Sequence, residues 1–232
     1  MATRLRTAAL TSMAAALLLT AGATGAASAN GATPGVKACN GYVGLTYDDG
    51  PTSTTSALVN ALNSAGVKAT FFVWGQRAQQ NPSALQQVVS AGHWVANHSW
   101  THPHMTSLST TQMASEISQT QNGIQQTTGQ RPTLFRPPYG ETNATLRSVE
   151  QQQGIQAEVL WSHDSRDWAG ASTQQIVQTA SSMNAGNIIL MHDGYQTTIQ
   201  AIPQIVSNLA ARNLCPGKIV PGTNMQPRVV AP

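Results

Sequence analysis

Two adjacent carboxylates, Asp48 and Asp49, end an apolar run and precede Gly-Pro in the stretch LTYDDGP. The whole chain of 232 residues has nine acidic side chains, so a doublet is unusual. An isolated sequence of this kind is typical of an Asp-Gly turn with a second, solvated Asp. A bound cation gives another reason for the doublet, because it neutralises one carboxylate and allows the other to stay ionised nearby.

Two imidazoles, His98 and His102, lie four residues apart in HSWTH, so a helical turn would point both the same way. With one carboxylate from another strand they would form a two-histidine, one-carboxylate site suited to Zn²⁺ or a similar divalent ion. The spacing alone is equally compatible with a structural role. His93 and His104 are more simply read as core or loop histidines. If Asp49 binds the metal, Asp48 is left as a base beside the activated water.

His192 follows the apolar stretch NIILM and is the candidate general acid. A buried imidazole in that role needs a group that fixes its tautomer and raises its pKa, and Asp164 is the candidate. Arg136, in RPPYG, could pair with Asp48 and hold it ionised. The competing interpretation of Arg136 and Asp164 is a structural ion pair.

Short apolar segments alternate with helical patterns along the chain. The pattern predicts strands over 42–47, 69–73, 93–96, 134–135, 157–161 and 187–191, and helices over 54–64, 82–91, 110–127, 142–153, 173–183 and 198–211. This alternation indicates an α/β fold with a mainly parallel sheet, open or closed into a barrel. Each polar cluster follows a predicted strand, where α/β proteins place their sites. The residues after Cys215 read as irregular.

The first residues resemble a secretory signal peptide. Arg4 and Arg6 precede an apolar stretch and the small-residue sequence ASA, which predicts a leader at 1–29 and a single catalytic domain at 30–232. Without the two arginines the formal charge falls from +3 to about +1, and no basic run indicates a nucleic-acid partner. No later segment is apolar enough to span a membrane. We therefore expect a secreted protein.

Two cysteines, Cys39 and Cys215, lie near the two ends of the predicted mature chain. In an exported protein they are expected to form a disulfide. The alternative is a pair of buried free thiols.

Five motifs, in order, resemble those of the polysaccharide deacetylase family, the nodulation-protein-B homology domain of carbohydrate esterase family four. They are TYDDG, HSWTH, RPPYG, DSRDW and ILMH, and the resemblance runs from about Gly41 to the C-terminal region. The flanking stretches are most similar to those of secreted bacterial acetylxylan esterases.

The resemblance implies a distorted, incomplete (β/α) barrel and a role for each matching position. Asp48 would be the base, held by Arg136, and His192 would be the acid, tuned by Asp164. The other implied roles are metal binding by Asp49, His98 and His102, an oxyanion contact from the Tyr139 N–H, and a wall for the acetyl methyl group from Trp168 and Leu190.

The resemblance also implies a Zn²⁺- or Co²⁺-dependent esterase that acts on acetylated xylan. Nothing in the sequence marks an oligomer interface, so we expect a monomer. The nearest alternative is an N-deacetylase of chitin or of peptidoglycan N-acetylglucosamine. Other classes are a catalytically silent carbohydrate-binding protein and an iron-dependent oxygenase, which would need a cosubstrate site. The chain has no G-x-S-x-G sequence, so nothing indicates a covalent acyl-enzyme.

Overall fold

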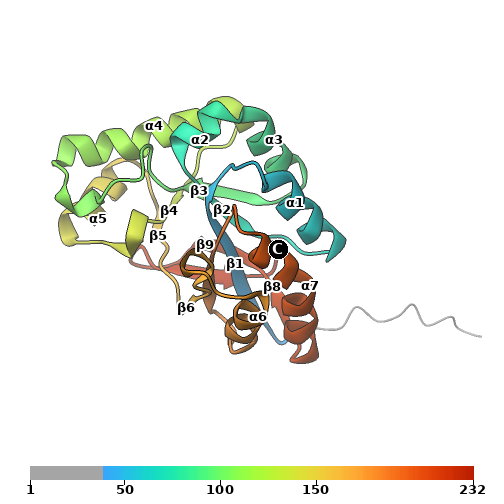
Figure 1. Ribbon diagram of the computed structural model, residues 1–232. Coiled ribbons are helices and arrows are strands. Elements are labelled where there is room, and N and C mark those ends of the chain that lie inside the picture. The colour runs from blue at the N-terminus through green and yellow to red at the C-terminus, as the bar shows by residue number, and fades with distance from the viewer. Residues whose placement is uncertain (1–38) are drawn as a thin grey trace, which may run out of the picture. The chain divides into compact units, whose positions relative to one another are not determined.

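The computed structural model describes residues 39–232, which belong to one compact unit. A parallel sheet with the strand order β5-β4-β3-β2-β1-β7-β6 forms its centre, and helices lie around the outside of the strands (Figure 1). The strands of this path are β1 Gly41–Gly50, β2 Thr70–Val73, β3 Trp94–Asn97, β4 Leu134–Phe135, β5 Ala157–Glu158, β6 His163–Asp164 and β7 Ile188–His192. The path ends at β5 and β6 without pairing them, so the barrel is incomplete. The expected fold is confirmed.

Helices connect most successive strands of this path, although none lies between β5 and β6, and they cover the sheet. They are α1 Thr55–Ser64, α2 Gly75–Gln80, α3 Pro82–Ser90, α4 Thr110–Thr128, α5 Ala144–Gln152, α6 Thr173–Ser181 and α7 Gln196–Ala211. Pro82 begins α3 as expected. The preceding Asn81 makes no capping hydrogen bond with its side chain, whose Nδ2 donates to the Arg77 carbonyl at 3.3 Å. Within residues 39–232, no helix has the length and apolar character needed to cross a bilayer.

Two apolar clusters cover the two faces of the central strands. Val43, Leu45 and Tyr47 of β1 pack against buried residues of α1, α3, α6 and α7. On the other face, Phe72 and Ile188 pack with residues of the chain's last segment. β1 is therefore buried on both sides, as expected of the central strand in a parallel sheet.

The expectation that the chain is irregular after Cys215 was wrong. Strand β8, Leu214–Pro216, pairs with the start of β1, and β9, Lys218–Pro221, forms an antiparallel hairpin with β10, Pro227–Val230. Ile219 and Val229 of this hairpin pack into the second apolar cluster. Their burial stabilises strands that the surrounding prolines and glycines conceal in the sequence.

The disulfide between Cys39 and Cys215 is present and closes a sequence separation of 176 residues. It lies beside the short parallel pairing of β8 with β1, in which Tyr42 is opposite Cys215. The covalent link and the strand pairing thus join the start of the described chain to the segment that follows α7 at the same place.

Candidate active site

A β-bulge at the end of β1 places both carboxylates of the doublet in one cavity. β1 pairs in register with β7 as far as Asp48, which is opposite His192, and its register with β2 shifts between Asp48 and Gly50. Asp49 has a φ of 68°, a left-handed conformation. Successive side chains of a regular strand point to opposite faces, whereas an added residue in this conformation bends the strand. Both Asp48 and Asp49 line the same cavity.

Asp48 is paired with Arg136, as the sequence suggested. Arg136 is fully buried, and its Nη1 donates to Asp48 Oδ1 at 2.7 Å and to the Thr46 hydroxyl at 2.8 Å. Its Nε donates to the Val159 carbonyl at 2.9 Å, and its guanidinium lies 4.0 Å from the centre of the Phe72 ring. Burial raises the pKa of Asp48, and the positive charge of Arg136 opposes that effect.

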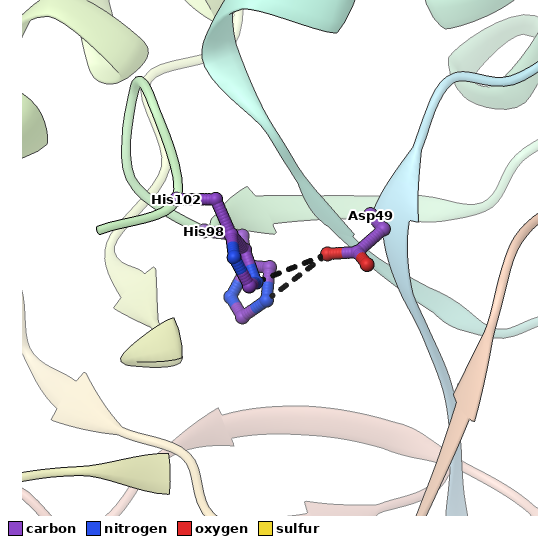
Figure 2. A group of neighbouring side chains, drawn as sticks. All are labelled: Asp49, His98 and His102. Carbon is purple, nitrogen blue, oxygen red and sulfur yellow. Dashed lines mark ion pairs between the residues drawn. The ribbon is translucent and has the colours of Figure 1, made fainter. Parts of the chain in front are cut away.

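Asp49, His98 and His102 point toward one another (Figure 2). Asp49 Oδ1 lies 3.5 Å from His98 Nε2 and 3.3 Å from His102 Nε2. His98 Nδ1 lies 2.7 Å from the Arg136 carbonyl, a contact in which the nitrogen must donate, and this leaves the lone pair of Nε2 facing Asp49. The three side chains thus form one group of potential ligands.

These three side chains fit a divalent cation. Burial lowers the pKa of His98 to about 3 and also lowers the pKa of His102, so both rings are neutral near pH 7. Asp49 Oδ1 is buried and receives no hydrogen bond. A buried carboxylate oxygen that receives no hydrogen bond and faces the lone pair of His98 Nε2 is electrostatically unfavourable by itself. A cation among the three side chains would remove that cost.

The His98–His102 segment is an irregular turn rather than the expected helical turn. Ser99 and His102 both have positive φ values, 65° and 59°, and the His102 N–H donates to the Ser99 hydroxyl at 3.0 Å. Glu116 of α4 accepts hydrogen bonds from the backbone amides of Trp100 and Thr101 at 2.8 and 2.7 Å. The convergence of the two imidazoles therefore depends on contacts with α4 as well as on their spacing.

Asp167, not Asp164, is the partner of His192, which corrects the sequence interpretation. Asp167 Oδ1 lies 2.7 Å from His192 Nδ1, and Oδ2 accepts from the His192 backbone N–H and the Thr198 hydroxyl, each at 2.7 Å. Burial would lower the pKa of His192, but the hydrogen bond to Asp167 and the negative charge of Asp48 outweigh it and raise that pKa. Nδ1 therefore donates to Asp167.

Asp164 also lines the cavity, but it contacts different groups. Its Oδ1 accepts from the Arg166 backbone N–H at 2.8 Å and from Trp168 Nε1 at 3.3 Å. After β6 the chain bends at Arg166, whose φ is 55°, and the short helical turn Asp167–Ala169 brings Asp167 under His192. The sequence DSRDW offers two carboxylates, and the bend at Arg166 determines that Asp167, and not Asp164, contacts His192.

A cavity of about 380 Å³ brings the expected site residues together. Tyr139 and Trp168 are 55% and 54% exposed, although both are large aromatic residues, so they offer surface to a ligand. Three lining residues were not expected from the sequence, namely Pro137, Trp161 and Tyr195. The complete lining is Asp48, Asp49, His98, His102, Pro137, Tyr139, Trp161, Asp164, Trp168, Leu190, His192 and Tyr195.

His93 and His104 lie outside the cavity lining, as expected. His93 is buried, and its Nδ1 accepts from the Ala69 N–H at 3.2 Å. His104 is exposed, stacks on the Tyr139 ring at a centroid distance of 4.2 Å and pairs with Glu141 at 3.0 Å. Arg136 is not at the cavity surface but reaches the site through Asp48.

Comparison with known proteins gives one consistent result. A family model described as polysaccharide deacetylase matches residues 35–157. A bifunctional xylanase/xylan deacetylase of Cellvibrio japonicus is 46% identical over 196 residues, covering 84% of this chain and 29% of that protein. A peptidoglycan-N-acetylglucosamine deacetylase of Listeria monocytogenes is 36% identical over 178 residues, covering 75% of this chain and 37% of that protein.

Among solved structures, a family 4 carbohydrate esterase from Streptomyces lividans in complex with acetate is 57% identical. The match has a TM-score of 0.81 and covers 84% of this chain and all of that one. The chain thus corresponds to about a third of the length of these curated relatives and to the whole of the solved esterase.

Proposed function

Because this chain belongs to the polysaccharide deacetylase family, carbohydrate esterase family 4, whose members are hydrolases acting on acetyl groups of polysaccharides, we propose that it is a secreted, metal-dependent acetylxylan esterase. The observation that carries this proposal is the division of the Asp doublet. Asp48 is bound by a buried arginine, while Asp49 faces two neutral imidazoles. The two carboxylates are therefore suited to different tasks.

Asp49, His98 and His102 would hold the divalent ion, which is Zn²⁺ or Co²⁺ in this proposal. An ion in that position lowers the pKa of water and polarises an acetyl carbonyl. Three protein ligands leave coordination positions open, as catalytic sites require.

Asp48 and His192 would move the protons. Arg136 occupies Asp48 Oδ1, so Oδ2 is the oxygen that accepts a proton from the attacking water. His192 donates Nδ1–H to Asp167, which leaves Nε2 to carry a proton to the departing sugar oxygen. Asp48 and His192 are opposite each other on β1 and β7, so base and acid stand on adjacent strands.

The remaining lining residues would position the acetyl group. The Tyr139 N–H is assigned to the developing oxyanion, a contact that is commonly a large contribution in acyl transfer. Trp168 and Leu190 are assigned to the methyl group. In this proposal Asp164 does not act on His192. It positions the Trp168 indole, which forms part of the pocket wall, by accepting a hydrogen bond from Trp168 Nε1.

The preference for xylan is supported by similarity. The xylanase/xylan deacetylase is 46% identical, and the chitin and peptidoglycan deacetylases among the relatives are 32–38% identical. Secretion is supported by the disulfide, which persists in oxidising compartments. The predicted leader at 1–29 lies outside the described residues.

Acetate release from acetylated xylan and from chitin oligomers, measured side by side, tests the substrate. We expect release from xylan, and release from chitin oligomers alone would replace the proposed substrate with an N-acetylated one. The silent carbohydrate-binding alternative predicts release from neither.

Replacing Asp48 with Asn tests the proposed base. The variant should lose acetate release and still bind one equivalent of Zn²⁺, because Asp49, His98 and His102 are unchanged. Normal turnover by the variant would remove the assignment of Asp48.

A further inference from the structure

Residues 74–76, at the start of α2, join the two loops that carry the proposed metal ligands. The backbone amides of residues 74–76 donate in turn to the carbonyl oxygens of Gly50, Ser99 and Trp100, at 3.0, 2.9 and 3.1 Å. Gly50 follows Asp49, and the other two acceptors lie between His98 and His102. A Cβ on Gly75 would lie 2.3 Å from the Trp100 ring, so only glycine permits this close approach.

Arg77 fixes the backbone of Asp49. Its Nη1 donates to the Asp49 carbonyl oxygen at 2.6 Å. Asp49 is in the left-handed region, which a non-glycine residue adopts at a cost unless surrounding contacts hold it there. A hydrogen bond from a charged donor is stronger than one from a neutral donor, so this contact is well suited to hold that conformation.

Trp74 connects the same arginine to a second ligand. The Arg77 guanidinium lies 4.0 Å from the centre of the Trp74 ring, in cation–π geometry. The Trp74 ring in turn packs beside the His102 ring, with centroids 5.2 Å apart and an interplanar angle of 35°. Asp49 and His102 are thus both in contact with the Trp74–Arg77 pair.

We propose that Arg77 and Trp74 are positioning residues that hold Asp49 and His102 at the separation needed to share one cation. Neither belongs to the five motifs that define the site, and neither lines the cavity. The inference rests on the proposed metal site. Groups that orient ligands typically change metal affinity by about 10–100-fold when they are replaced.

The charge of Arg77 gives the proposal a sign that can be tested. A positive group near a cation site opposes cation binding, so if Arg77 acted only through its charge, Arg77→Met would tighten Zn²⁺ binding. If Arg77 holds Asp49, the same variant binds Zn²⁺ more weakly. Arg77→Lys keeps the charge but replaces the planar fork with a flexible single amine, and it should also weaken binding, to a smaller extent.

The experiment measures Zn²⁺ dissociation constants of the full chain by competition with a chromophoric chelator, together with the visible spectrum of the Co²⁺ form. Arg131→Met is the matched control, because Arg131 is exposed, bonds to Gln121 and Asn122 of α4, and precedes the amino end of β4. We expect Arg77→Met to weaken Zn²⁺ binding by about 10-fold or more and to change the Co²⁺ spectrum, and Arg131→Met to do neither.

The Zn²⁺ affinity and the Co²⁺ spectrum of Arg77→Met decide whether Arg77 holds Asp49. Wild-type Zn²⁺ affinity and Co²⁺ spectrum in Arg77→Met, or tighter binding, would overturn the positioning role. If Arg77→Met does not fold by circular dichroism, Arg77→Lys and Trp74→Phe decide in its place, and wild-type affinity in both would overturn it. Failure of the unmodified chain to bind Zn²⁺ would overturn the proposed metal site instead.

Discussion

Asp167→Asn tests the assignment of the proposed acid, because it removes one negative charge beside His192 and changes little in shape. Asp167 is 1% exposed and accepts from both the backbone N–H and Nδ1 of His192. An asparagine oxygen can still accept one of these hydrogen bonds, but it carries no charge to stabilise the imidazolium. The pKa of His192, which Asp167 raises in the unmodified protein, should therefore fall.

The size of the effect follows from the contact that is lost. A hydrogen bond to a charged group contributes about 1.5–3 kcal/mol, and 1.36 kcal/mol corresponds to one pH unit, so the alkaline limb of the pH–rate profile should move by about one to two units. His192 must be protonated to act as the acid, so the limb moves to lower pH. At pH values above the alkaline limb, kcat of the variant should be about 10–100-fold lower than that of the unmodified protein, because a smaller fraction of His192 is protonated.

The assay is kcat for acetate release from acetylated xylan as a function of pH. Asp164→Asn is the control, because Asp164 lines the same cavity but bonds to Arg166 and Trp168. It should leave the alkaline limb in place and act mainly on KM, through the Trp168 wall. Movement of the alkaline limb in Asp164→Asn but not in Asp167→Asn would contradict the assignment of Asp167 as the partner of His192.

Three further predictions concern the metal, a buried acid and the disulfide. Chelation should abolish acetate release, and Zn²⁺ or Co²⁺ without oxidant should restore it, whereas a need for an oxidant would favour the iron oxygenase alternative. Burial, and to a smaller extent the nearby Glu158 carboxylate, raises the pKa of Glu150 from 4.5 to about 9. The folded protein therefore favours the protonated side chain, and the stability gained from this protonation is complete below about pH 4.5 and is lost as the pH rises toward 9. In Glu150→Gln the free energy of unfolding, measured by urea titration, should fall less between pH 4.5 and pH 7, by up to about 3 kcal/mol. An unchanged pH dependence would contradict the raised pKa of Glu150. Replacing Cys39 and Cys215 with Ser should lower the free energy of unfolding by roughly 4–5 kcal/mol in the same titration, and a smaller loss would indicate structure in the unfolded chain.

The sequence was sufficient to predict the main strands because each is a short apolar run that ends in polar residues. It was also sufficient to predict that Asp48, His98, Arg136 and His192 lie at one edge of the sheet, since the carboxyl ends of parallel strands meet there. The four-residue spacing of His98 and His102, however, could not show that the two histidines lie in an irregular turn. Their geometry depends on positive φ values and on Glu116 of a distant helix.

Two other features were not predictable because they depend on contacts made after folding. The choice between Asp164 and Asp167 depends on a bend at Arg166. Helix α2 is short and polar, so it has no apolar stripe, yet residues 74–76 at its start donate to both ligand loops. In each case the local sequence permits several conformations, and the tertiary contacts select one.

The disulfide between Cys39 and Cys215 has a consequence for a damaged molecule. A cut in any loop between these residues yields two fragments that stay covalently joined beside the β1–β8 pairing. The fragments cannot diffuse apart, so their reassociation is an intramolecular event that does not depend on protein concentration. A single cut would therefore leave all the residues of the site on one covalently joined molecule.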